Sequence, residues 1–230
     1  MAFTYRTEVL HLPFRDPFRI ARHEDADASQ TVLTHLEQDG VTGLGECFPV
    51  PYYGETVETT EAVLPLLAGA LDALSPLPPD RAEAVEWLER SAQLMSDALG
   101  NHGGAKMGLD TALHDMAAKA QGVPIWQLIG TSDQLPPTDY SLGIDDPATV
   151  AERARRVAHF PALKIKVGGP SDIETLEAVR AVFSGPLRVD ANTAWEPEQA
   201  AALIPELDRL GVELVEQPFK ARMLPELRWL

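Results

Sequence analysis

The chain has 230 residues, of which 45% are hydrophobic and 23% charged, the proportions of a globular protein with a sizeable core. Its formal charge of −16 at pH 7 disfavours nucleic acids and anionic membrane surfaces as partners. The lone Cys47 excludes an intrachain disulfide, and the first residues form no apolar leader segment. The most apolar stretch, Ala62 to Leu74, contains Pro65 and Asp72 and is too short to span a bilayer. These features predict a cytoplasmic protein without a membrane partner.

The first half of the chain has the pattern of an α+β domain. A strand is expected at about Thr4 to Leu12, followed by a polar, charged loop from Phe18 to Ser29. Apolar and polar residues then alternate, and Asp39-Gly40 predicts the turn of a β-hairpin. Helical periodicity follows at about residues 57–74, 81–99 and 105–120. We expect these elements to form one domain, residues 1–121.

In the second half, strands and helices alternate. Strands are expected at about residues 139–144, 163–167, 187–190 and 213–216, with helices at 147–159, 171–183 and 197–210. Ser171 to Glu174 resembles a capping box at the start of the second of these helices. Strict alternation with apolar strands predicts a parallel sheet, open or closed into a barrel. The expected second domain, residues 122–230, is therefore α/β and contains four β/α units.

Three polar clusters stand where strands of this second domain are expected to end: Lys164-Ile-Lys166, Asp190-Ala-Asn192 and Glu216-Gln-Pro218. Asp190 follows Lys166 by 24 residues, and Glu216 follows Asp190 by 26. One strand, one helix and two short loops need about that length, so the clusters are expected at the ends of successive strands.

The two lysines are expected on one face of their strand, because side chains alternate faces along a strand. Each ammonium group would lower the pKa of the other, and a nearby divalent cation would lower both further. A lysine with a lowered pKa is a competent base near neutral pH. The alternative is an exposed edge strand with two solvated lysines, and the spacing of Lys164 and Lys166 alone does not separate the two.

The acidic residues indicate a metal site. Asp190 and Asn192 share a face of their strand, and Glu216 ends an apolar strand. Carboxylates gathered at strand ends suit Mg²⁺, which prefers oxygen ligands in octahedral geometry. Asp190 alone could equally be a helix N-cap, so the prediction depends on the combination and its spacing. Together with the lysines, this set predicts metal-assisted abstraction of a proton.

With these three clusters the chain resembles the enolase superfamily, in its muconate-lactonizing-enzyme-like branch. It is most similar to the dipeptide epimerases of the L-Ala-D/L-Glu type. The resemblance runs from end to end. Besides the three clusters, the matching segments are Pro17 to Arg22, Gly43 to Pro49, Tyr53 to Thr56, Ala112 to Asp115, Lys119 and Gly122 to Pro124. It implies an α+β capping domain, a modified TIM barrel and one Mg²⁺ ion.

The resemblance also implies roles for the clustered residues. Asp190 and Glu216 match two metal ligands, and Asn192 lies beside them. Lys166 matches a general acid/base, and Lys164 would neutralise the substrate carboxylate. The implied reaction is epimerisation of a dipeptide through an enolate, formed when the α-proton next to the metal-bound carboxylate is removed.

Three further residues are expected to contact the substrate. Ser141 matches a small hydroxyl residue on the first barrel strand, and the loop that holds Arg22 and Asp25 would close over the distal part of the dipeptide. Relatives specific for glutamate present an arginine near the position of Asp25. Because the residue here is acidic, we expect the second residue of the dipeptide to be apolar or cationic.

Two elements of the family pattern are missing. The third metal carboxylate and the second catalytic lysine of the family lie in later barrel strands, and this sequence ends after four predicted strands. The chain is therefore expected to be part of a longer isomerase, inactive by itself and homo-oligomeric as relatives commonly are. The alternatives are an enzyme like N-succinylamino-acid racemase or o-succinylbenzoate synthase, and a truncated, non-catalytic paralogue that serves as a binding or assembly subunit.

Overall fold

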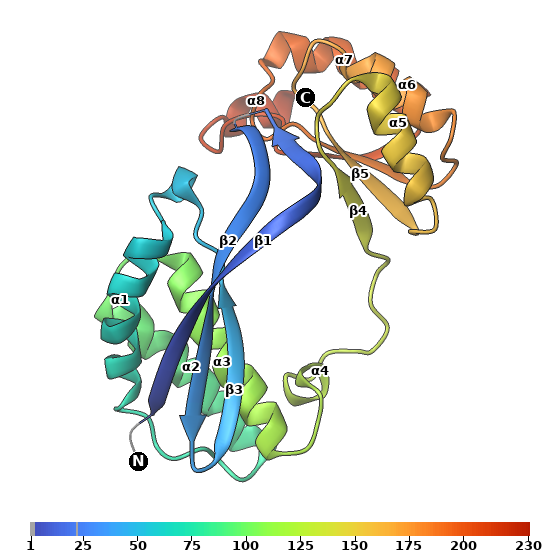
Figure 1. The fold of residues 1–230 in the computed structure, drawn as a ribbon. Helices are drawn as coiled ribbons and strands as arrows, with labels where there is room; N and C mark the ends of the chain where they lie inside the picture. Colours follow the sequence, from blue (N-terminus) through green and yellow to red (C-terminus); the bar gives the residue numbers. More distant parts are fainter. Residues whose placement is uncertain (1–2, 22) are drawn as a thin grey trace. The chain divides into compact units, whose positions relative to one another are not determined.

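The computed structural model describes residues 3–21 and 23–230, without the side chains of residues 23–26 (Figure 1). The chain divides into two compact units, one comprising residues 1–12 and 29–135, the other residues 13–28 and 136–230. The expected domain boundary, after residue 121, falls inside the first unit. The reason is that Leu128, in the short helix α4 (Ile125–Leu128), is fully buried in the core of that unit.

The first unit combines a three-stranded sheet with helices, as the sequence predicts. The strands are β1 (Thr4–Ile20), β2 (His23–Gln38) and β3 (Val41–Cys47), in that order, and β2 pairs antiparallel with β3. The other helices are η1 (Pro51–Tyr53), α1 (Val57–Leu71), α2 (Arg81–Ala98) and α3 (Gly103–Ala120). None of the helices in the described residues is both long and apolar enough to cross a lipid bilayer.

Helix α3 lies close against strand β3 because two glycines of the strand have no side chain. A Cβ atom at Gly43 would overlap the carbonyl oxygen of Ala112, and one at Gly45 would overlap that of Gly108. Cys47, at the end of the same strand, is fully buried in this core. Burial raises the pKa of its thiol to about 12, so Cys47 is an inert core residue, not a nucleophile.

The predicted loop from Phe18 to Ser29 is wrong. Strand β1 continues to Ile20 and β2 already begins at His23, so most of this segment is a β-hairpin. Tertiary contacts override its polar composition, because residues 13–28 of β1 and β2 belong to the second unit and bind to other residues of that unit. The backbone N–H of Ile144 donates to the carbonyl oxygen of Arg19 at 2.9 Å. Arg156 also donates to both carboxylate oxygens of Asp16 at 2.7 Å.

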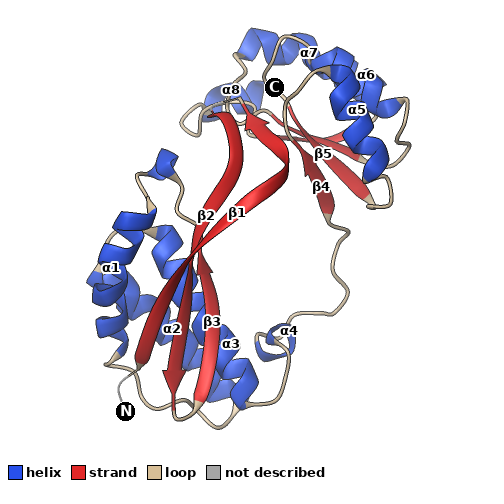
Figure 2. Ribbon diagram, in the orientation of Figure 1, coloured by secondary structure: helices blue, strands red, loops and turns tan. Residues whose placement is uncertain are grey.

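The second unit contains the predicted parallel sheet (Figure 2). Strands β4 (Asp139–Leu142), β5 (Ala162–Lys166), β6 (Leu187–Asp190) and β7 (Val212–Glu216) pair in parallel in this order. The helices are α5 (Pro147–Arg156), α6 (Asp172–Arg180), α7 (Pro197–Arg209) and α8 (Leu224–Trp229). The mixed α/β architecture, with an antiparallel α+β part followed by β/α units of a TIM-type barrel, confirms the predicted fold class.

The predicted capping box at Ser171 does not form. The Ser171 side chain makes no capping hydrogen bond to helix α6. The neighbouring Asp172 instead turns its buried carboxylate back toward the loop after β5, where it accepts hydrogen bonds from the backbone N–H groups of Gly168 and Gly169 at 2.9 Å. The indole N–H of Trp195 also donates to it, at 3.4 Å. Asp172 thus ties together the loops that follow Lys166 and Asn192.

Candidate active site

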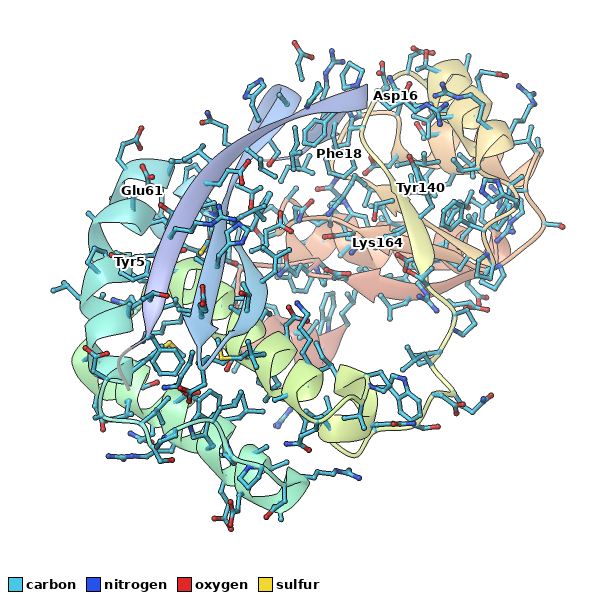
Figure 3. All side chains as sticks on the ribbon, turned by 60° about the horizontal axis from the view of Figure 1, so that its bottom comes forward. Tyr5, Asp16, Phe18, Glu61, Tyr140 and Lys164 are labelled. Carbon is cyan, nitrogen blue, oxygen red and sulfur yellow. The ribbon has the colours of Figure 1, made fainter. Side chains whose placement is uncertain are left out.

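The strand register brings the three predicted polar clusters together on one face of the parallel sheet. Ser141 of β4 pairs with Lys164 of β5, and Lys166 pairs with Asp190 of β6. Asp190 pairs in turn with Glu216 of β7. Figure 3 marks Lys164 on the strand next to that of Tyr140. Because residues paired across parallel strands point the same way, the lysines, the two carboxylates and the Ser141 hydroxyl share this face.

The lysines and the carboxylates form a closed set of ion pairs. Lys164 donates from Nζ to Oε2 of Glu216 at 2.8 Å and lies 3.6 Å from Oδ2 of Asp190. Lys166 donates to the same oxygen of Asp190 at 2.6 Å. The Asp190 side chain is 2% exposed and that of Lys166 is 11% exposed, whereas Glu216 is 39% exposed. Two cations and two anions therefore balance, with the Asp190–Lys166 pair the more deeply buried.

This pairing decides the charge state of Lys164 and Asp190. Burial lowers the pKa of Lys164, but the hydrogen bond to Glu216 and the negative charges of Glu216 and Asp190 outweigh it and hold the pKa above its ordinary value. For Asp190, burial raises the pKa, and the hydrogen bonds from Lys166 and from the Asn192 backbone bring it below the ordinary value. The expected lowering of the lysine pKa by like charge is thus wrong for Lys164, because the carboxylates lie closer than the sequence could show.

Asn192 binds the Asp190 carboxylate through both its backbone and its side chain. Its backbone N–H donates to Oδ1 of Asp190 at 2.8 Å, and its side-chain amide donates to Oδ2 at 3.4 Å. Its Oδ1 atom is buried and has no hydrogen-bond partner among the described residues. Asn192 has φ 45°, and Gln217, directly after Glu216, has φ 43°. Left-handed backbone is costly for residues other than glycine, and here it occurs two residues after Asp190 and one residue after Glu216. Such strain is concentrated at functional sites.

The oxygen atoms fit part of a magnesium shell. The carboxylates of Asp190 and Glu216 both lie within reach of the Lys164 ammonium group. The unpartnered Oδ1 belongs to the Asn192 side chain, whose amide nitrogen lies 3.4 Å from Oδ2 of Asp190. All three donors are hard oxygens, the type that Mg²⁺ prefers. Within residues 3–21 and 23–230, no three side chains of His, Cys, Asp or Glu gather into a complete metal cluster. The described donors therefore suit the ion without completing six-fold coordination.

Two predicted substrate contacts cannot be placed. Arg22 and the side chain of Asp25 lie outside the described residues. The sequence prediction missed one charged pair on the same face, Arg188 of β6 and Asp139 of β4, joined at 2.9 Å. The alternation that singled out the lysines could have found Arg188, since it stands two residues before Asp190 on the same strand.

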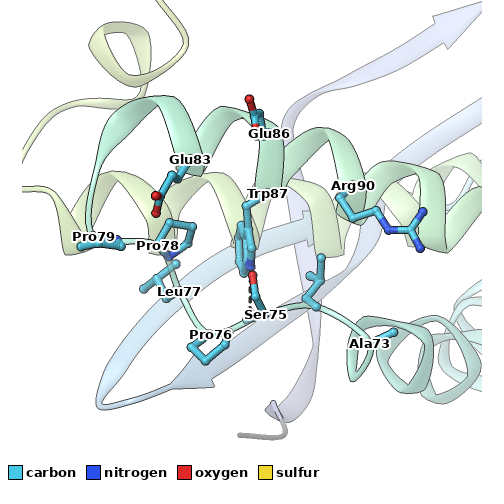
Figure 4. Close-up of a pocket in the computed structure, with 11 residues that line it drawn as sticks. Ala73, Ser75, Pro76, Leu77, Pro78, Pro79, Glu83, Glu86, Trp87 and Arg90 are labelled. Carbon is cyan, nitrogen blue, oxygen red and sulfur yellow. Dashed lines mark hydrogen bonds between the residues drawn. The ribbon is translucent and has the colours of Figure 1, made fainter.

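A separate hollow lies in the first unit, between the α1–α2 connection and helix α2 (Figure 4). Its volume is about 480 Å³, and it is lined by apolar residues such as Leu77 and Trp87 and by the charged residues Glu83, Glu86 and Arg90. The indole N–H of Trp87 donates to the carbonyl oxygen of Ser75 at 3.0 Å. None of the lysines or carboxylates of the candidate site lines this hollow.

Lysines and carboxylates at the ends of parallel β/α strands, preceded by an α+β unit, define the class of the enolase-type enzymes. Family models agree: the mandelate racemase / muconate lactonizing enzyme N-terminal domain matches residues 4–130, and the enolase C-terminal domain-like family matches residues 148–230. The chain belongs to the mandelate racemase / muconate lactonizing enzyme family of the enolase superfamily.

Within this family the chain is similar to dipeptide epimerases. It is 30% identical over 222 residues to an L-Ala-D/L-Glu epimerase of Bacteroides thetaiotaomicron, covering 95% of this chain and 55% of that protein. It is 31% identical to a hydrophobic dipeptide epimerase of Enterococcus faecalis, with 95% and 61% covered. A dipeptide epimerase structure from Enterococcus faecalis, complexed with Mg and L-Leu-L-Tyr, has a TM-score of 0.87 at 30% identity and covers 100% of this chain and 64% of that one. The chain thus spans less than two thirds of these relatives.

Proposed function

We propose that this chain belongs to a Mg²⁺-dependent dipeptide epimerase, an isomerase that inverts the α-carbon next to a substrate carboxylate. The observation that carries the proposal is the pair of lysines hydrogen-bonded to Asp190 and Glu216 at the ends of β5, β6 and β7. The similarity to named dipeptide epimerases supports it. A cytoplasmic location and a homo-oligomeric state belong to the same proposal.

The residues would divide the chemistry as follows. Lys164 neutralises the substrate carboxylate, and the Ser141 side chain, beside it on β4, contacts the substrate. Lys166, in its neutral form, removes the α-proton on one face, which leaves an enolate and a lysine ammonium. Mg²⁺, held by Asp190 and Glu216, would stabilise the charge that develops on the carboxylate. Inversion also needs a second acid on the opposite face, and the family resemblance assigns that role to later barrel strands.

The lysine role is tested by proton exchange. With the protein produced from its complete gene, α-proton exchange of a dipeptide in D₂O should be visible by NMR in the presence of Mg²⁺. Lys166→Ala should slow exchange by at least about 100-fold, the usual contribution of a general base. Lys106→Ala, on helix α3 of the first unit, is the control and should leave the rate unchanged. Exchange at the wild-type rate in the Lys166 variant would contradict the assignment.

The choice of dipeptide follows from the acidic residue in the hairpin. We propose that the second residue of the preferred dipeptide is apolar or cationic, because the carboxylate of Asp25 would repel a glutamate side chain. The similarity to a hydrophobic dipeptide epimerase supports the apolar choice. A panel of L-Ala-L-X dipeptides and N-succinyl amino acids, compared by exchange in D₂O, checks this. Fastest exchange with L-Ala-L-Glu would reject the specificity, and fastest exchange with an N-succinyl amino acid would favour the racemase alternative.

A further inference from the structure

A third cation lies on the same face of the parallel sheet as the two lysines. Arg188 of β6 pairs in register with Lys164 of β5, so the two side chains are neighbours that point the same way. The guanidinium nevertheless turns away from the carboxylates of the candidate site. It donates from Nη1 to Oδ2 of Asp139 on β4 at 2.9 Å, with both side chains more than two thirds buried.

The Arg188 side chain has to cross strand β5 to reach Asp139. Strand β5 separates β4 from β6, and the register pairs Asp139 with Ala162 of β5. Arg188 pairs two residues further along the same strand, with Lys164. The arginine side chain therefore crosses β5 diagonally, toward the amino ends of the strands, and passes the position of the small side chain of Ala162. A longer side chain at this position would occupy that path.

The alternative partners of Arg188 are Asp190 and Glu216, which lie in the opposite direction, toward the carboxyl ends of the strands. Asp190 stands two residues further along β6 on the same face, at about 6.6 Å for a rise of about 3.3 Å per residue. An extended arginine side chain reaches that far. Guanidinium groups bind carboxylates in strong, often two-pronged hydrogen bonds, so Asp190 and Glu216 would attract an Arg188 that lacked Asp139.

The charges on this face are balanced one to one. Lys164 binds Glu216, Lys166 binds Asp190, and Arg188 binds the remaining carboxylate, Asp139. We propose that Asp139 is a positioning residue, which holds Arg188 off Asp190 and Glu216 and so keeps both carboxylates available to the lysines and to a divalent cation. The part of this inference that concerns the cation rests on the proposed function.

Mg²⁺ affinity tests the inference without relying on activity. The protein from the complete gene is titrated with MgCl₂ by calorimetry as the wild type, Asp139→Ala, Arg188→Met and the double variant. We expect Asp139→Ala to weaken Mg²⁺ binding by about tenfold, since a charged hydrogen bond to a ligand carboxylate must then be displaced. Arg188→Met should stay within about threefold of the wild type, and the double variant should return to the affinity of Arg188→Met.

A simple structural ion pair predicts a different pattern. In that case Arg188→Met would weaken binding as much as Asp139→Ala, and combining them would restore nothing, which would overturn the proposal. Glu177→Gln is the matched control, because it breaks a 2.6 Å ion pair to Arg209 between two helices of the same unit and should not change Mg²⁺ binding. Asp139→Asn, which keeps the shape of the side chain and a weaker acceptor, serves if the alanine variant does not fold.

A metal-free crystal structure separates this inference from the proposed function. In Asp139→Ala, crystallised with EDTA, the Arg188 guanidinium should lie within hydrogen-bond distance of Asp190 or Glu216. If it stays directed toward position 139 or turns to solvent, the proposal is wrong. If the wild type binds no Mg²⁺, the proposed metal is wrong, but the position of Arg188 in the variant still decides the role of Asp139.

Discussion

The candidate site is controlled by ion pairs between single residues on one face of the parallel sheet, some on adjacent strands and others two strands apart. Asp190 is the centre of these pairs, since it accepts from Lys166 at 2.6 Å and from the Asn192 backbone at 2.8 Å. With its side chain 2% exposed, it depends on these donors to remain charged. Removing one partner of such a buried pair leaves the other uncompensated, which costs more than the pair itself contributes.

The lowered pKa of Asp190 predicts a pH dependence of stability. An acid whose pKa is lower in the folded state contributes stability above its unfolded pKa of about 3.9, and this contribution is lost as the pH falls through the folded pKa. Asp190→Asn should therefore reduce the free energy of unfolding by about 3 kcal/mol at pH 7 without metal, and the difference from the wild type should narrow below about pH 4.

Urea denaturation with EDTA between pH 3 and pH 8 measures this difference. Glu89→Gln, at an exposed position of helix α2, is the control and should follow the wild type at every pH. A difference between Asp190→Asn and the wild type that stays constant down to pH 3 would show that the carboxylate is not held charged by Lys166.

Lys164 behaves in the opposite sense, because its raised pKa gives stability that is lost only as the pH rises above about 10.4.

At the scale of the elements, close approach of backbone to backbone shapes the first unit. Helix α3 runs directly over β3, where Gly45 faces the carbonyl oxygen of Gly108. The same pair of elements buries Cys47, Leu109 and Met116. Glycine in the strand therefore serves helix packing and not a turn.

This contact predicts opposite effects for two glycine substitutions. Gly45→Ala should destabilise the protein by about 1–3 kcal/mol, because the added methyl group overlaps backbone atoms that cannot move independently. Gly69→Ala, in the last turn of α1 with no atom within 4 Å of the added Cβ, should stabilise it by about 0.4–1 kcal/mol, because alanine restricts the unfolded chain more than glycine does. Thermal and urea unfolding compare the two, and equal effects of both substitutions would contradict the packing argument.

At the scale of the whole molecule, the chain passes between its two units three times. Residues 1–12 and 29–135 form one core, and residues 13–28 and 136–230 form the other. The tip of the β1–β2 hairpin therefore belongs to the unit that carries the lysines, although it is more than a hundred residues away in sequence. Arg153 of α5 joins this arrangement, since it lies 3.7 Å from Asp16 of the hairpin and binds Asp145 at 2.8 Å.

The alternation of strands and helices, the parallel sheet and the position of the polar clusters could be predicted from the sequence. These features depend on local patterns: the period of apolar residues, the turn at Asp39-Gly40 and the length of one β/α unit. Short-range sterics and burial determine such patterns, so residues within one segment are sufficient to show them. The family resemblance rested on the same segments and was confirmed by the family models.

The partner of each charge was decided only by the tertiary structure. Strand register brings Glu216 to Lys164 across 52 residues of chain and Asp139 to Arg188 across 49, and no local pattern contains this information. The hairpin beyond Phe18 and the carboxylate of Asp172, turned to the loop after β5, likewise depend on contacts with distant segments. Electrostatic energies change steeply over a few ångströms, so the pKa of Lys164 rises or falls according to neighbours that only the folded chain supplies.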